Sequence, residues 1–135
     1  MSGDARLMCG IALILIPTIV YGGLTVLHVI SKGTLGPGGP KNLAPDQVSF
    51  YRAGHAHAGV LTLLALILQI VLDSAALPLG LTWAVRIGAV VAAICVSGGF
   101  FAVAHVRALR GLLYFGAFLV AATTLTTGIG LLRAL

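Results

Sequence analysis

The stretch FYRAGHAHAGVLTLLALILQIVL, Phe50–Leu72, decides the fold of this chain. Arg52 is its only charged residue, and the run is long enough to cross a bilayer core as a helix, which takes about 20 residues. Three more runs of this kind cover residues 7–30, 83–105 and 112–132. A mean hydropathy of +1.12 with 8% charged residues means more apolar surface than one small soluble core can bury. The sequence therefore predicts an all-α integral membrane protein.

The connections between these runs predict how the helices are arranged. Residues 31–49 are rich in Gly and Pro and are predicted to form one long loop, whereas residues 73–82 and 106–111 form short connections. Helices joined by short loops lie antiparallel beside each other. We therefore expect a single domain over residues 1–135, an up-and-down four-transmembrane-helix bundle, in the lipid bilayer of a bacterial cell membrane.

Basic residues fall near both ends of the predicted helices. The net charge is +5, but without a basic helix or an aromatic platform no nucleic-acid partner is expected. One end carries Lys32, Lys41, Arg52, Arg107 and Arg110. The other end carries Arg6, Arg86 and Arg133. The positive-inside rule would make the first end cytoplasmic, but a cofactor with acidic groups would attract the same cations, so both orientations stay open.

The scarcity of acidic residues disfavours several classes of function. The chain has no Glu, and Asp4, Asp46 and Asp73 fall in the predicted tail or loops, so a carboxylate proton relay and a carboxylate di-iron site are not expected. Hydrolytic catalysis is not expected either, because no Ser or Cys has a plausible base and acid beside it. Whether the protein is an enzyme stays open.

The four histidines are the main functional signal. His28 lies near the end of the first predicted helix, His55 and His57 open the second, and His105 closes the third, so the topology brings all of them to one end. Residues i and i+2 of a helix point about 200° apart, so only one of His55 and His57 should face the bundle. His55 shares a small and polar face with Gly59, Thr62 and Gln69, which favours it as the inward residue. His57 shares a face with leucines, which suits lipid or a partner subunit.

These positions favour a haem of the b type. The first and third helices should lie diagonally across the bundle, about 13 Å apart if neighbouring helices are 8–10 Å apart, which would make His28 and His105 an axial pair. His55 could replace either or hydrogen-bond to one. Three arginines at the same end, Arg52, Arg107 and Arg110, would pair with the propionates. The expected role is electron transfer, haem sensing or haem handling, with a redox partner, a larger membrane complex or a second copy of the chain as possible partners.

Two alternatives to a haem site stay open. The imidazoles of His28, His55, His57 and His105 would also suit zinc or copper, both of which bind nitrogen ligands strongly. A small subunit or scaffold without a cofactor would explain the helices, but it would leave the shared end of the histidines to chance.

The stretch YRAGHAHAGVLTLL, Tyr51–Leu64, resembles the start of an early helix in the catalytic subunits of haem-copper oxidases and nitric oxide reductases. There an Arg-x-x-His pattern supplies an axial ligand of the low-spin haem, and Arg52 and His55 match its two positions. The resemblance implies haem ligation by His55. Because the chain lacks that family's paired histidines and its twelve helices, reduction of dioxygen or nitric oxide is not implied.

Overall fold

The computed structural model describes residues 1–32 and 43–135. These contain helices α1 (Gly3–Lys32), α2 (Pro45–Val71), α3 (Leu79–Val103) and α4 (Arg110–Leu132), with 3-10 turns η1 (Leu72–Ser74) and η2 (Arg107–Leu109). All four helices are long and apolar enough to span a membrane. The predicted all-α membrane bundle is therefore confirmed. The middle of the predicted loop, including Lys41, lies outside the described residues.

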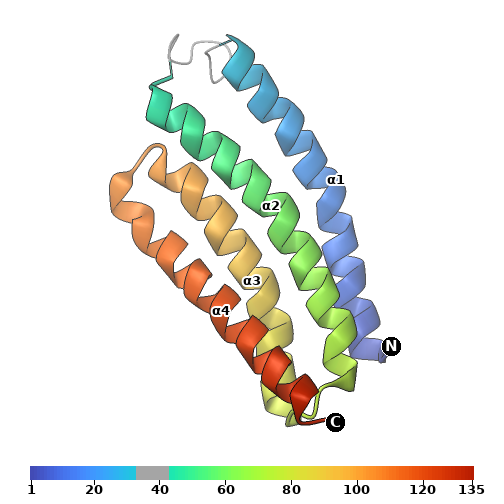
Figure 1. Cartoon of the computed structure of the whole chain (residues 1–135). Helices are drawn as coiled ribbons and strands as arrows, with labels where there is room; N and C mark the ends of the chain where they lie inside the picture. The colour runs from blue at the N-terminus through green and yellow to red at the C-terminus, as the bar shows by residue number, and fades with distance from the viewer. Residues whose placement is uncertain (33–42) are drawn as a thin grey trace.

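The helices run up and down and pack in the order of the sequence (Figure 1). The main contacts are α1 with α2, α2 with α3, and α3 with α4, so α2 lies between α1 and α3. The sequence had suggested that the first and third helices lie diagonally across a closed bundle. In the structure the helices pack in a row, and α2 separates α1 from α3. Much of α1 is exposed, including Ile14, Leu24 and Leu27, because it packs mainly against one neighbour.

Helices α1 and α3 each begin four residues before the predicted position, and two further differences affect the end that carries the histidines. Helix α2 begins at Pro45, within the predicted loop 31–49, because Pro is well suited to the first turn of a helix. The Gln47 side chain accepts a hydrogen bond from the Ala44 N–H at 3.0 Å and so satisfies a donor that this helix start would otherwise leave free. Helix α3 ends at Val103, so His105 lies in the turn after the helix.

Glycines bring α3 and α4 into backbone contact. A Cβ atom on Gly116 of α4 would lie 2.7 Å from the backbone nitrogen of Val96 on α3, and one on Gly99 would lie 3.0 Å from Cα of Leu113. Both glycines are buried. Small residues allow this close approach, which favours helix association in a bilayer, where hydrophobic burial contributes little.

We predict that Gly116→Ala weakens this interface. Its Cβ would overlap backbone, which cannot move aside without shifting a helix, so the free energy of unfolding should fall by about 1–3 kcal/mol. Gly128→Ala on the same helix is the matched control, because nothing lies within 4 Å of its added Cβ. Unfolding in mixed detergent micelles measures both variants. Equal stability of the two would contradict the interface.

Candidate functional site

The four histidines lie at one end of the bundle but do not converge. The end of α1, the start of α2 and the turn after α3 are close to the same end (Figure 1). Among the described residues, however, no three His, Cys, Asp or Glu side chains are grouped to hold a metal ion. The four imidazoles must therefore be considered one at a time.

His28 and His105 face different surroundings. His28 is exposed on α1, as are Tyr21 and Thr25 on the same helix face. His105 is also exposed, and its Nε2 lies 2.8 Å from the hydroxyl of Tyr51. Since α2 lies between α1 and the turn that carries His105, this arrangement does not favour His28 and His105 as an axial pair.

His55 is half-buried and packs against α1. A Cβ on Gly23 would lie 2.6 Å from both Cε1 and Nε2 of the ring, so the imidazole edge with Nε2 lies against the α1 backbone. The same ring borders an apolar groove of about 430 Å³ between α1 and α2. Arg52, one turn earlier on this helix, is exposed. Gly23 is the residue that gives the His55 ring room beside α1.

The two ring nitrogens of His57 differ in protonation. Its Nδ1 lies 2.8 Å from the backbone oxygen of Ala53, and because a carbonyl only accepts, Nδ1 must carry the proton. In the neutral ring Nε2 then has a free lone pair, which is the arrangement found in metal-binding histidines. The ring packs on Phe100 of α3, with centroids 4.8 Å apart.

The leucines that share a face of α2 with His57 are largely covered by this chain, whereas His57 itself is exposed. Leu68, on the same face of α2, is only 6% exposed, and Leu61 and Leu64 border a small crevice against α3 and α4. The reason is that α2 has a neighbour on both sides. Residues 200° apart, such as His55 and His57, can therefore each contact another helix.

A groove of about 500 Å³ opens beside Phe100, where α2, α3 and the start of α4 meet. Its walls are mostly aromatic or aliphatic and its rim is charged, and the lining consists of Asp46, Phe50, Phe100, Val103, Arg107, Arg110, Leu113 and Tyr114. Arg107 pairs with Asp46 at 3.3 Å, but both side chains are at least half exposed, so the pair contributes about 0–1 kcal/mol. The rim arginines are thus available to an acidic ligand.

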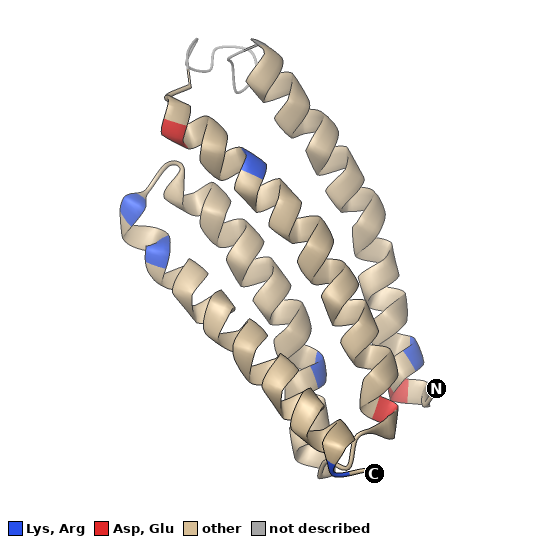
Figure 2. Cartoon of the chain, viewed as in Figure 1, with Lys and Arg blue, Asp and Glu red and all other residues tan. Residues whose placement is uncertain are grey.

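Charged residues lie towards the two ends of the bundle and leave the middle of each helix uncharged (Figure 2). Arg107 and Arg110 line the α2–α3–α4 groove, whereas Arg52 is one turn from His55, which borders the α1–α2 groove. Arg52 lines neither groove, so the three arginines expected to act together do not share one site.

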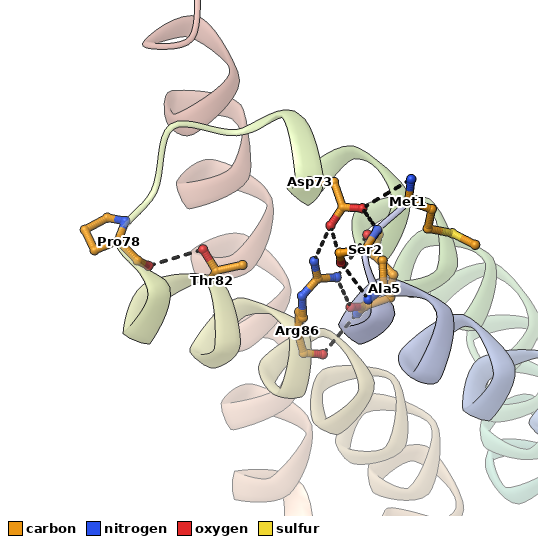
Figure 3. Close-up of polar contacts among 8 residues, drawn as sticks. Met1, Ser2, Ala5, Asp73, Pro78, Thr82 and Arg86 are labelled. Carbon is orange, nitrogen blue, oxygen red and sulfur yellow. Dashed lines mark hydrogen bonds and ion pairs between the residues drawn. The ribbon is translucent and has the colours of Figure 1, made fainter.

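The opposite end contains a polar cluster that the sequence reasoning missed (Figure 3). Arg86 is only 2% exposed and Gln69 is fully buried. The Arg86 guanidinium donates to the backbone oxygen of Gln69 at 3.0 Å and to its side-chain oxygen Oε1 at 3.1 Å. It also donates to the Asp73 carboxylate at 2.6 Å. The sequence placed Arg86 among the basic residues at this end of the bundle but did not predict that it is buried and joins α3 to α2. Its position three residues inside the predicted run 83–105 was the available signal, because buried charges in membrane helices need partners.

The same carboxylate also fixes the start of α1. Ser2 Oγ donates to Asp73 at 2.8 Å and accepts from the Ala5 N–H at 3.1 Å, so Ser2 caps the helix and ties it to η1. Three helices are therefore joined at this end. The cluster is best explained as a structural clamp, because its polar groups are directed at one another.

Neither family models, nor curated proteins, nor solved structures give a match to this chain.

We predict that Asp73→Ala destabilises the protein. Without the carboxylate, Arg86 is a buried charge with only amide oxygens as partners, but Asp73 itself is partly exposed to solvent, so the loss should be about 1–3 kcal/mol. The matched control is Asp46→Ala, which removes the exposed partner of Arg107 and should cost no more than about 1 kcal/mol. Detergent unfolding measures both, and similar losses in the two variants would refute the clamp.

Proposed function

We propose that this protein binds haem in the α2–α3–α4 groove near one membrane surface, with His57 as the axial ligand. The observation that carries the proposal is the hydrogen bond from His57 Nδ1 to the Ala53 carbonyl, which leaves Nε2 free to ligate iron. A hydrogen bond from the ring nitrogen that does not bind the metal fixes the tautomer and ring orientation of a histidine ligand.

The groove beside Phe100, the residue on which the His57 ring packs, has the properties that a haem requires. Its volume of about 500 Å³ falls within the range of ligand pockets. Phe50, Phe100 and Tyr114 provide apolar, flat walls, and Phe100 also contacts the His57 ring. Arg107 and Arg110 at the rim suit the propionates, since guanidinium binds carboxylate through two parallel hydrogen bonds.

The choice of His57 differs from the one that the resemblance implied. His55 packs near Gly23 of α1 and lines the α1–α2 groove, which has no arginine in its lining. His57 instead packs on Phe100, which lines the groove that carries Arg107 and Arg110. Of the residues expected to serve a haem, Arg107 and Arg110 line the groove proposed here. His57, which was expected only as a zinc or copper ligand, takes the place of His55.

The geometry supports haem handling more than electron transfer. Haem supplies a redox-active iron when bound, and cytochromes commonly hold that iron with two protein ligands. This site offers one imidazole, and the ring of His57 is exposed. A cofactor held in this way can exchange with the bilayer or a partner, which a carrier or sensor requires.

We predict that His57→Ala abolishes haem binding whereas His55→Ala preserves it. Haemin is titrated into the detergent-purified protein and the Soret band is followed, and loss of the ligand should raise the dissociation constant at least about tenfold. The two variants remove the same side chain from positions two residues apart, so loss of binding in His55→Ala alone would contradict the proposal.

The rim arginines make a separate prediction. The double variant Arg107→Gln/Arg110→Gln should weaken haemin binding by about tenfold, since charge-assisted hydrogen bonds contribute about 1.5–3 kcal/mol and these are exposed. The control is Arg6→Gln/Arg133→Gln, which removes two exposed cations from the other end. Equal haemin affinity of the two double variants would exclude the arginines from the site.

A further inference from the structure

Among the described residues, Asp46 is the only acidic one at the end of the bundle that carries the histidines. The chain has three acidic residues. Asp4 lies in the first turn of α1 and Asp73 in η1, and both are at the opposite end (Figure 2). Asp46 instead borders the groove of α2, α3 and α4, together with Arg107 and Arg110. The lining of this groove therefore combines one negative side chain with two positive ones.

The two carboxylate oxygens of Asp46 have different partners. Oδ1 accepts a hydrogen bond from the Gln47 N–H at 3.0 Å, in the first turn of α2, where a negative charge is favourable. Oδ2 accepts from Nη2 of Arg107 at 3.3 Å. The first contact holds the carboxylate at the start of the helix, and the second joins it to the rim of the groove.

The contact with Arg107 is weak enough for a ligand to open. Its distance of 3.3 Å is longer than the charge-assisted hydrogen bonds of about 2.7–2.9 Å that ion pairs form at close range. The Arg107 side chain is 87% exposed and that of Asp46 is 50% exposed, so water competes for both groups. An acidic ligand that binds Arg107 must still displace this carboxylate and remain near its charge, which is unfavourable.

We propose that Asp46 limits the affinity of the groove for acidic ligands, because its carboxylate holds Arg107 until an acid group of the ligand replaces it. This role of Asp46 rests on the proposed haem site, since the propionates are the acid groups that would take its place. A ligand without acid groups leaves the ion pair intact. Asp46 therefore makes the affinity for an acidic ligand lower than the two arginines alone would give.

The variant Asp46→Asn tests this competition. Its amide keeps an oxygen for the Gln47 N–H but carries no charge, so α2 keeps its first turn while Arg107 is released. Haemin affinity, measured by Soret titration in detergent, should rise about two- to fivefold, which corresponds to about 0.4–1 kcal/mol. Asp4→Asn is the matched control, because it removes an exposed charge from the first turn of α1 at the opposite end, and it should leave the affinity unchanged.

Two further probes separate the acid groups of the ligand from its iron. Protoporphyrin IX carries the same propionates without iron, and its affinity, followed by porphyrin fluorescence, should rise by the same factor in Asp46→Asn. Haemin dimethyl ester has no free acid group, so Asp46→Asn and the original protein should bind it equally. An error in the choice of His57 as iron ligand would leave the protoporphyrin result unchanged, so the two proposals can fail separately.

Three results would overturn the role of Asp46 while haem binding itself stands. One is equal haemin affinity of Asp46→Asn and the original protein. Another is the same gain in affinity for haemin dimethyl ester. The third is an undiminished gain from Asp46→Asn in a protein that already carries Arg107→Gln, because competition for Arg107 requires that residue. If the original protein binds neither haemin nor protoporphyrin IX, both proposals are wrong.

Discussion

The backbone contact between α3 and α4, made possible by Gly99 and Gly116, is the interaction on which the arrangement of the bundle depends. In a bilayer the lipid chains are as apolar as the side chains, so close packing decides which helices become neighbours. Glycine allows Val96 and Leu113 to approach the opposite backbone. This contact places α4 beside α3, with α2 on the other side of α3, and so creates the groove that carries Arg107 and Arg110.

The two ends of the bundle have different physical roles. At one end Arg86, Asp73 and Ser2 connect three helices through hydrogen bonds and an ion pair. At the other end the imidazoles diverge, and the arginines at the rim of the groove are exposed. The buried, structural charge of Arg86 is thus separated from the exposed charges of Arg107 and Arg110 at the other end.

The sequence was sufficient for the four spans and for the shared end of the histidines, because both follow from run lengths and alternating direction. It did not predict the direction of the rings. We assumed that only one of His55 and His57 faces the protein, but α2 has neighbours on both sides, so His55 meets Gly23 while His57 meets Phe100. The sequence did not predict the partners of Arg86 either. Gln69 lies on α2 and Asp73 in the turn η1, so only tertiary packing brings them to Arg86.

The most direct measurement is the position of iron in a structure of the haem-loaded protein, located by anomalous scattering. We expect one iron peak within bonding distance of Nε2 of His57. The propionates of the haem should lie near Arg107 and Arg110 in the groove of α2, α3 and α4. A peak beside His55 in the α1–α2 groove, or between His28 and His105, would contradict this account.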